Sequence, residues 1–405
     1  MSPVHIVGLG IDQGELPVEI SRRVYRAEVL VGGSRLLARF EDHSGVKIPV
    51  KGPLADVLGT IRQEMDQGRE VVVLADGDPL FFGIGKRLID SLGGDNVIVY
   101  PNVTTLQAAA ARIRIPWENV RTVSLHGRRD IWPLLRALVF CDAVAVYTDR
   151  EFGPARIAEE LLRRDVDTFR MAVFENLGQE GECFREVELS RAREMDVSPL
   201  NFVLLQRVKQ PDIPLRLGIE DDLYVHEKGL ITKKEVRVVG LAQLQIGPHH
   251  TVWDLGAGCG SVAIEASILA RGGMVLAVEK MPQRVRLIKE NLKRTGAYVV
   301  EAICGEMPRC LESLPDPDRI FIGGGMGRGN GILETAARRL KPGGRMVVHL
   351  VLVGSLLRTK DYLHTLKWPF SITQIQVSRS KDITGDHRLE ALNPVFIIRT
   401  TKPSF

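Results

Sequence analysis

The sequence predicts an α/β protein of two domains, each built on a sheet of parallel strands. Short apolar runs rich in β-branched residues alternate with longer helical patterns along the whole chain; examples of the runs are VHIVGLG, VVVLADG, TVWDLG, MVLAVE and GRMVVHLVLV. Runs that are apolar at every position are typical of parallel strands that helices cover on both faces. The length of 405 residues exceeds that of one ordinary domain.

Composition narrows the class of protein. Hydrophobic residues make up 44% of the chain and charged residues 26%, which excludes a wholly disordered or fibrous protein. The net charge of +4 is small for this length and does not favour a nucleic-acid or membrane-surface protein. The cysteines show no metal-ligand spacing, and the N-terminus lacks the pattern of a signal peptide. We therefore expect a cytoplasmic protein without a metal site.

Helical patterns separate the strands, and a segment with two prolines divides the chain. The helical patterns cover Val18–Arg26, Leu54–Gln67, Pro154–Arg163, Gln283–Thr295 and Gly331–Leu340. Pro211 and Pro214 cannot donate backbone hydrogen bonds, and they bias the preceding residues away from helix. We therefore predict one domain at residues 1–210 and a second, of different design, at residues 211–405.

The sharpest motif lies in the C-terminal half, where a strand runs directly into a glycine loop and a helix. The strand covers Thr251–Leu255, and the loop consists of Gly256, Ala257, Gly258, Cys259 and Gly260. Glycines let the backbone turn tightly and approach a ligand, and the start of the following helix offers unpaired N–H groups. This combination favours a ligand site over an ordinary glycine turn.

Two acidic residues accompany the loop. Glu279 ends the next strand, where a carboxylate is placed to bind the two hydroxyls of a ribose. Asp254 precedes the first glycine, and we expect it to help orient the charged amino-acid part of a cofactor. A dinucleotide site prefers G-x-G-x-x-G, whereas this loop reads G-x-G-x-G. The spacing is that of Rossmann-like methyltransferases, which bind S-adenosylmethionine.

Two later loops extend this predicted site. Cys304–Pro308 follows the third strand of the half, where such a loop lies over an adenine ring. Ile322–Gly331 follows the fourth strand and contains six glycines: Gly323, Gly324, Gly325, Gly327, Gly329 and Gly331. A loop at the carboxyl end of a sheet strand either binds substrate or merely turns, and both interpretations stay open here.

The N-terminal half carries weaker signals. Val7–Leu16 reads as a strand, a glycine turn and the start of a helix. Val71–Gly85 is an apolar strand that ends in Asp76-Gly77-Asp78-Pro79, at a position where ligands bind. Thr104 and Thr105 stand just ahead of an alanine-rich helix, and their hydroxyls either cap that helix or bind a ligand.

The segments HEKGLITKKEVRVVGLAQLQIGP, WDLGAGCGSVAIEAS and NPVFII together resemble the carbon-15 methyltransferase and decarboxylase family of cobalamin biosynthesis. The resemblance covers most of Asp222–Thr401 and implies a Rossmann-like class I methyltransferase fold. It also implies S-adenosylmethionine binding by Thr232, Gly256, Ala257, Gly258, Cys259, Gly260, Glu279 and Met307. Relatives often carry Ser or Thr where this chain has Cys259, so a hydroxyl contact is not expected there.

The N-terminal segments VGLG, DGDPLFFG, PNVTTLQAA, VSLHGR and NFVLLQR resemble the tetrapyrrole methylase family, and more narrowly its carbon-5 methyltransferases. The resemblance covers roughly residues 3–207 and implies a two-lobed domain of the class III methyltransferase type. It implies a second S-adenosylmethionine site at Gly8, Gly10, Asp78, Phe81, Thr104 and Thr105. Ile11 stands where many relatives have proline, so the shape of that turn is expected to differ.

A chain with both halves in this order resembles fusion enzymes of the cobalamin pathway. The resemblance implies methylation of carbons 5 and 15 of a precorrin or cobalt-precorrin, loss of carbon dioxide from a ring acetate, one cofactor site per domain and a homo-oligomer. No catalytic residue is assigned; His126 is a candidate in the N-terminal half. Basic candidates for the substrate carboxylates are Arg128, Arg129, Lys233, Lys234, Arg237, Arg379 and Lys381.

Three other functions compete with this interpretation. An RNA base methyltransferase would use the C-terminal motif alone, but the modest charge and the aromatic content of 6% do not favour it. A non-catalytic S-adenosylmethionine sensor or scaffold would keep the same loops, because spacing does not prove turnover. A nicotinamide dehydrogenase is the weakest alternative, because the third glycine of its motif is missing.

Overall fold

The computed structural model describes residues 2–11, 14–324, 326–327 and 329–404. Its contacts divide the chain into two compact units. The first consists of Met1–Arg129, Asp142–Ala158 and Arg170–Gln206, and the second of Asp130–Cys141, Glu159–Phe169 and Arg207–Phe405. Two short segments before residue 210 are thus grouped with the second unit, and the predicted domain boundary after residue 210 stays a prediction.

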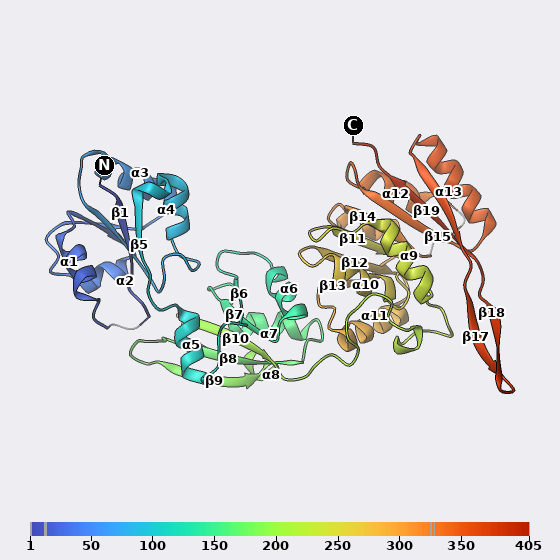
Figure 1. The fold of residues 1–405 in the computed structure, drawn as a ribbon, viewed down its shortest axis with the longest axis horizontal. Helices are drawn as coiled ribbons and strands as arrows, with labels where there is room; N and C mark the ends of the chain where they lie inside the picture. The colour runs from blue at the N-terminus through green and yellow to red at the C-terminus, as the bar shows by residue number, and fades with distance from the viewer. Residues whose placement is uncertain (1, 12–13, 325, 328, 405) are drawn as a thin grey trace. The chain divides into compact units, whose positions relative to one another are not determined.

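The first sheet of the first unit is parallel throughout, as the sequence predicts. Its strand order is β3-β2-β4-β1-β5. The strands are β1 Val4–Gly8, β2 Val29–Gly32, β3 Val46–Pro49, β4 Val71–Ala75 and β5 Val97–Tyr100. Every residue of β1, β2 and β4 is buried, because helices cover the sheet on both faces (Figure 1).

The second sheet of this unit is mixed, which corrects the prediction of parallel strands. Its order is β6-β7-β10-β8-β9, with β6 and β7 parallel but β10 antiparallel to β7 and β9 antiparallel to β8. The strands are β6 Arg121–Ser124, β7 Ala143–Tyr147, β8 Phe169–Glu175, β9 Cys183–Glu188 and β10 Asn201–Arg207. Buried antiparallel strands such as β10 are as continuously apolar as parallel ones, so the pattern alone does not distinguish them.

The second unit contains a seven-stranded sheet of order β13-β12-β11-β14-β15-β19-β16. Its strands are β11 Thr251–Leu255, β12 Met274–Glu279, β13 Val300–Cys304, β14 Arg319–Ile322, β15 Arg345–Leu350, β16 Phe370–Ile375 and β19 Val395–Thr401. The pairs from β13 to β15 are parallel. The last two strands, β19 and β16, are antiparallel to their neighbours, so the prediction of parallel pairing is wrong at this edge.

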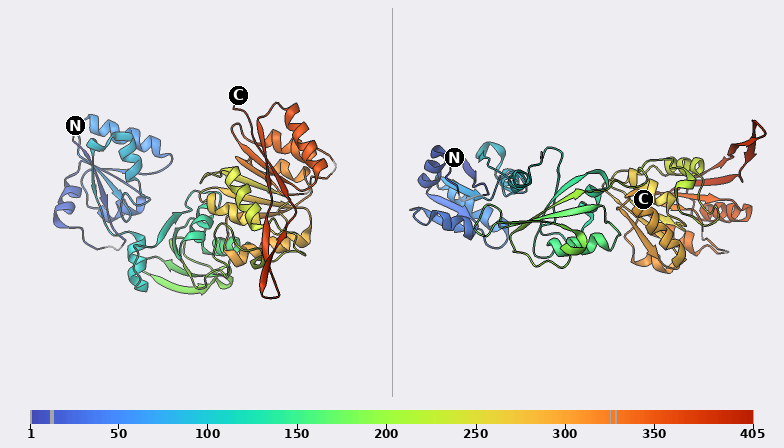
Figure 2. Two further views of the ribbon diagram at one scale, coloured as in Figure 1. Left: turned by 45° about the vertical axis from the view of Figure 1, so that its right-hand side comes forward. Right: turned by 90° about the horizontal axis from the view of Figure 1, so that it is seen from below.

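Alternate residues of this sheet belong to two separate apolar cores. Val252, Phe321 and Val347 pack on one face with helices α9 (Lys234–Leu244), α10 (Ser261–Leu269) and α11 (Pro282–Thr295). Trp253 and Ile320 pack on the other face with α12 (Gly331–Arg339) and α13 (Val353–Thr365). The views in Figures 1 and 2 show these helices on the two sides of the sheet. This sandwich places the carboxyl ends of β11, β12, β14 and β15 along one edge.

The helices begin and end close to their sequence patterns. They are α1 Val18–Arg26, α2 Ser34–Leu37, α3 Leu54–Asp66, α4 Gly85–Leu92, α5 Thr105–Ile113, α6 Trp132–Phe140, α7 Pro154–Leu162, α8 Leu189–Ala192, α9 Lys234–Leu244, α10 Ser261–Leu269, α11 Pro282–Thr295, α12 Gly331–Arg339 and α13 Val353–Thr365. The five predicted helices correspond to α1, α3, α7, α11 and α12.

A two-stranded ribbon, β17 Ser378–Ile383 and β18 Asp386–Ala391, was not predicted from the sequence. Figures 1 and 2 show it projecting from the sheet of the second unit. All residues of β18 are exposed, and the side chain of Leu389 is 75% exposed. The ribbon lacks an apolar face, so the alternating pattern that signals a strand is missing.

Candidate active site

The second unit contains a cavity of about 890 Å³ at the carboxyl ends of its parallel strands. The loops after β11, β12, β14 and β15 line it, together with the segment ahead of α9 and the chain around the base of the ribbon. A crevice at the carboxyl ends of parallel strands is the usual ligand site of an open α/β sheet. The cavity therefore lies where the sequence motif predicts a ligand.

The glycine loop forms part of the cavity wall and requires glycine at several positions. Gly256, Gly258 and Gly260 all have φ values between 61° and 82°, a region that favours glycine. A Cβ atom on Gly256 would lie 2.6 Å from the carbonyl oxygen of Gly324 in the loop after β14. Gly258 has no neighbouring atom within 4 Å of such a Cβ position, so its backbone faces open space.

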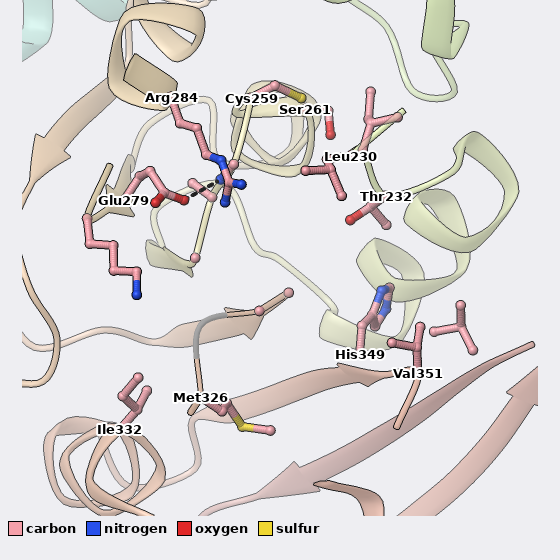
Figure 3. A pocket seen from close by; sticks show the side chains of 18 of the residues that line it. Leu230, Thr232, Cys259, Ser261, Glu279, Arg284, Met326, Ile332, His349 and Val351 are labelled. Atoms are coloured by element: carbon pink, nitrogen blue, oxygen red, sulfur yellow. Dashed lines mark hydrogen bonds between the residues drawn. The ribbon is translucent and has the colours of Figure 1, made fainter. Parts of the chain in front are cut away.

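Glu279 stands at the end of β12 and is bound to the same loop. Its Oε2 accepts a hydrogen bond from the backbone N–H of Gly258 at 3.0 Å (Figure 3). Its Oε1 accepts one from the N–H of Met281 at 3.0 Å. The side chain is nearly buried and lines the cavity. A carboxylate fixed by two backbone donors retains lone pairs for ligand hydroxyls.

Asp254 does not take the predicted position beside a cofactor. It is buried, it is not among the residues that line the cavity, and its Oδ2 accepts a hydrogen bond from the N–H of Ala263 in the first turn of α10. Burial, together with the nearby charge of Glu279, raises the pKa of Asp254 to about 7, although the hydrogen bond from Ala263 opposes the shift. Asp254 therefore holds the start of α10 in place behind the glycine loop and does not face the cavity.

The remaining C-terminal candidates differ in position. Thr232, Gly256, Ala257, Gly258, Cys259, Glu279 and Met307 line the cavity. Gly260 does not line it; a Cβ there would lie 3.0 Å from Ile288 of α11, so this glycine permits close helix packing. Burial raises the pKa of the Cys259 thiol, which keeps it neutral. Of the six glycines after β14, Gly325 lies outside the described residues and the other five line the cavity.

Arg237 is buried in an ion-pair network and is not free to bind substrate, which corrects its place among the basic candidates. Its Nε donates to Glu265 Oε1 at 2.7 Å, and its Nη1 donates to Asp221 Oδ1 at 3.2 Å and to the carbonyl of Thr232. Arg237 and Glu265 are both fully buried. The network fixes the backbone of Thr232, a residue of the cavity wall.

Most other basic candidates also have partners outside the cavity. Arg379 pairs with Asp221 and Glu235, and Lys234 pairs with Glu220. Lys381 pairs with Glu390 across the ribbon. Lys233 is the one candidate of this half that lines the cavity within the described residues. Sequence reasoning missed Lys280, Arg284 and His349, which line it too; their places at the ends of strands and the start of α11 were the available signal.

In the first unit, five of the six candidates divide between two hollows. The larger, of about 690 Å³, is lined by Gly10 and Thr105. The smaller, of about 530 Å³, is lined by Asp78, Phe81 and Thr104. Gly8 lines neither; a Cβ there would lie 2.5 Å from the carbonyl oxygen of Gly77, so its role is to let the β1 and β4 loops approach each other.

The hydroxyl of Thr104 caps helix α5. Its Oγ1 accepts a hydrogen bond from the N–H of Gln107, and the Gln107 side chain accepts one from the N–H of Thr104. This reciprocal pair is a capping box. Of the two interpretations that the sequence left open, the structure shows the cap for Thr104.

Thr105 faces the larger hollow with three titratable residues. It hydrogen-bonds Tyr147, whose pKa is raised by burial. Burial alone would raise the pKa of Asp149, but backbone N–H donors, including those of Phe152 and Gly127, lower it overall. His126, the candidate from the sequence, lines the same hollow. The arrangement offers a carboxylate, a phenol and an imidazole to one ligand.

Family comparisons match both halves of the chain. The family described as "Tetrapyrrole (Corrin/Porphyrin) Methylases" matches residues 3–192, and the "Precorrin methyltransferase domain" matches residues 222–402. Within the described residues, no helix is long and apolar enough to cross a membrane.

Individual relatives match the whole chain or its C-terminal half. A precorrin-6Y C(5,15)-methyltransferase [decarboxylating] from a Sinorhizobium species is 31% identical over 94% of this chain and 92% of its own length. The corresponding protein of Mycobacterium tuberculosis is 30% identical over 86% of this chain and 87% of its own length. A probable cobalt-precorrin-6B C(15)-methyltransferase (decarboxylating) from Pyrobaculum calidifontis is 35% identical over 45% of this chain and 94% of its own length.

Proposed function

Since the chain belongs to the precorrin-6Y C(5,15)-methyltransferase (decarboxylating) family, we propose that its two domains divide the reaction between them. Residues 1–210 methylate carbon 5, and residues 211–405 methylate carbon 15 and release carbon dioxide. The chain is an S-adenosylmethionine-dependent C-methyltransferase of cobalamin biosynthesis. The match of the C-terminal half alone to probable C(15)-methyltransferases supports the division.

The residues of the C-terminal cavity fit S-adenosylmethionine. The open space at Gly258 lies beside the carboxylate of Glu279, and Met307 belongs to the same wall. Glu279 would bind the ribose hydroxyls, and the backbone of Gly256–Cys259 would hold the amino-acid part. When bound, the cofactor supplies a methyl group on a positively charged sulfur.

The chain contributes to this reaction mainly by alignment and by excluding water. Apolar side chains line much of the cavity; they include Leu230, Ile231, Val236, Met326, Ile332 and Val351. Figure 3 shows Glu279 and Arg284 on one side of the cavity and Thr232, His349 and Val351 on the other. When the cofactor and the macrocycle are held together between these walls, methyl transfer takes place within one complex. This lowers the entropic part of the activation free energy.

Basic side chains in the cavity wall would bind carboxylates of the precorrin. Lys233, Lys280 and Arg284 line the cavity, and Arg284 is oriented by a hydrogen bond of 3.0 Å to Glu227. Charge-assisted hydrogen bonds of this kind fix position more strongly than neutral ones. We infer that these three residues set the orientation of the macrocycle relative to the cofactor.

A second cofactor site belongs to the first unit on this proposal. The larger hollow, with Gly10 and Thr105, would hold the cofactor. The smaller hollow, with Asp78 and Phe81, would be a further part of the same cofactor site. We further propose that the protein is a homo-oligomer, supported by the neighbouring exposed apolar side chains of Leu352, Val353 and Leu357 at the start of α13. Sedimentation of the full chain measures this directly; a monomer at all concentrations would contradict it.

The cofactor sites are tested by isothermal titration of the full chain with S-adenosylmethionine. Two equivalents should bind per chain, and Glu279→Gln should weaken one of them only. If only one equivalent of S-adenosylmethionine binds and Glu279→Gln weakens it, the chain has the C-terminal cofactor site but not the N-terminal one. Binding without any turnover of a tetrapyrrole would favour a sensor, and strongly salt-dependent RNA affinity would favour an RNA methyltransferase.

A further inference from the structure

His349 is a buried histidine of the C-terminal cavity that the proposed steps do not yet use. It lies in the last part of β15, and its side chain lines the cavity (Figure 3). The residue is 9% exposed. Among the described residues, neither ring nitrogen, Nδ1 or Nε2, has a hydrogen-bond partner.

The surroundings of the ring are apolar. Phe321 of β14 packs edge-on against it, with 4.5 Å between the ring centroids. On the other side, Gly240 of α9 makes room for the ring, because a Cβ on Gly240 would collide with Nε2 of His349. Burial lowers the pKa of His349 to about 3, so the imidazole is neutral at neutral pH.

These nitrogens do not help the fold. A buried polar atom without a partner destabilises the folded chain, whereas an apolar side chain of similar size would pack here without that cost. Buried polar groups in folded proteins are nearly always paired, so an exception on the wall of a ligand cavity points to a partner supplied by the ligand.

The reaction contains a place for such a group. Methylation of a ring carbon that carries hydrogen forms a new C–C bond with an electron pair of the macrocycle, breaks the S–CH₃ bond, and leaves one proton to be removed from that carbon. Decarboxylation of a ring acetate breaks its C–C bond to the carboxylate and leaves an electron pair on the CH₂ carbon, which takes up one proton. One step therefore releases the proton that the other consumes.

We propose that His349 carries this proton between the two steps in the C-terminal cavity. The low pKa belongs to the ring buried against Phe321 and Gly240. We therefore place proton uptake after the ring has turned toward the macrocycle, where the substrate carboxylates favour the imidazolium. There the imidazole accepts the proton from the methylated carbon and returns it to the carbon that has lost carbon dioxide. No proton is gained or lost overall, and no oxidant or reductant is needed. The inference deepens the proposed function and rests on it.

The test uses the full chain with His349→Leu, His349→Gln and, as a matched control on the surface of the same unit, His364→Leu. His364 is exposed on α13. Mass spectrometry follows the first methyl group, the second methyl group and the loss of carbon dioxide in one sample. Carbon-5 methylation in the N-terminal half then serves as an internal control for each variant.

The proposal predicts that both His349 variants slow the second methylation and the loss of carbon dioxide by about a hundredfold or more. Carbon-5 methylation and the binding of S-adenosylmethionine should stay unchanged, and His364→Leu should behave as the unaltered chain. The thermal unfolding temperature of His349→Leu should be equal to or above that of the unaltered chain.

Several results would overturn the proton transfer. One is an unaltered rate for either C-terminal step in His349→Leu, because a shared proton must affect both. Another is recovery of the rate in His349→Gln, because an amide hydrogen-bonds but does not carry a proton at neutral pH. If instead the unaltered chain gives neither the second methyl group nor carbon dioxide, the proposed function fails rather than the role of His349.

Discussion

The two halves of the molecule form their candidate sites in different ways. In the C-terminal half, seven of the eight predicted cofactor residues line one cavity, because consecutive strands of one sheet deliver their loops to the same edge. In the N-terminal half, five of the six candidates divide between two hollows. The sixth, Gly8, lines neither hollow and allows the loops after β1 and β4 to pack closely. A motif contained in one βαβ unit thus locates a site more closely than residues collected from several loops.

The largest effect is expected from breaking the ion pair beneath the C-terminal cavity. Glu265→Gln leaves the buried Arg237 without its main counter-charge and should lower the free energy of unfolding by about 3–5 kcal/mol. Calorimetry of the full chain measures it, with Glu290→Gln on the exposed face of α11 as the control. A change no larger than that of the control would show that the pair does not hold the cavity wall.

Two glycines allow the halves to be disabled one at a time. Gly256→Ala places a Cβ 2.6 Å from the carbonyl of Gly324, and Gly8→Ala places one 2.5 Å from the carbonyl of Gly77. Backbone must move in each case, at a cost of about 1–3 kcal/mol. Gly256→Ala should abolish the second methylation and the loss of carbon dioxide, whereas Gly8→Ala should abolish the first methylation.

The control is Gly59→Ala in α3, where the new Cβ meets no atom within 4 Å. If one of the two test variants lowered the methylation rates at carbons 5 and 15 equally, the division of the reaction between the halves would be contradicted.

Removing the charge of Glu279 sharpens the comparison. Glu279→Gln keeps the size of the side chain but weakens hydrogen bonds to ligand hydroxyls by about 1.5–3 kcal/mol. The affinity of the C-terminal site for S-adenosylmethionine should fall roughly tenfold to a hundredfold, as 1.4 kcal/mol is a factor of ten. Titration calorimetry separates it from the N-terminal site, and an unchanged affinity would remove Glu279 from the cofactor site.

Asp254 predicts a pH dependence that belongs to the C-terminal half. Its pKa is about 7 in the folded chain and about 3.9 in an unfolded one, so the folded chain binds the proton more tightly. The resulting stabilisation is complete below about pH 4 and is lost as the pH rises through 7. Asp254→Asn keeps an acceptor for Ala263 and should remove this slope from urea unfolding curves. An unchanged slope would mean that Asp254 is ionised throughout.

The smallest effect distinguishes two adjacent threonines in the N-terminal half. Thr104→Ala removes the cap of α5 and should cost about 1 kcal/mol of stability without weakening cofactor binding. Thr105→Ala should leave stability unchanged and weaken cofactor binding at the carbon-5 site. Thermal unfolding and titration of both variants measure this, and weaker binding by Thr104→Ala at unchanged stability would reverse the assignment.

The sequence predicted the fold class, the family and the positions of the buried strands and amphipathic helices that leave regular patterns, such as β1, β4, β11, β12, α3 and α11. It did not predict strand direction in the second sheet or at the edge formed by β19 and β16, since direction leaves no mark on an apolar run. It also missed the ribbon, whose residues are mostly exposed and polar.

The limits at the site have a similar cause. Asp254 and Arg237 belong to residue types that bind ligands, but a sequence does not show whether a charge is buried behind a loop or faces a cavity. His349 sits within an apolar run, and that run predicts a buried strand rather than a site residue, although the histidine lies near the carboxyl end of the strand. Burial and partners, which only the structure supplies, decide these roles.

Mass spectrometry tests the central claim most directly. A precorrin substrate is incubated with S-adenosylmethionine and either the full chain or chains cut near Pro211. The full chain should add two methyl groups and release carbon dioxide, residues 1–210 should add one methyl group without loss of carbon dioxide, and residues 211–405 should supply the other methyl group and the decarboxylation. Release of carbon dioxide by the N-terminal part, or no mass change with either cobalt-containing or metal-free substrate, would contradict the account.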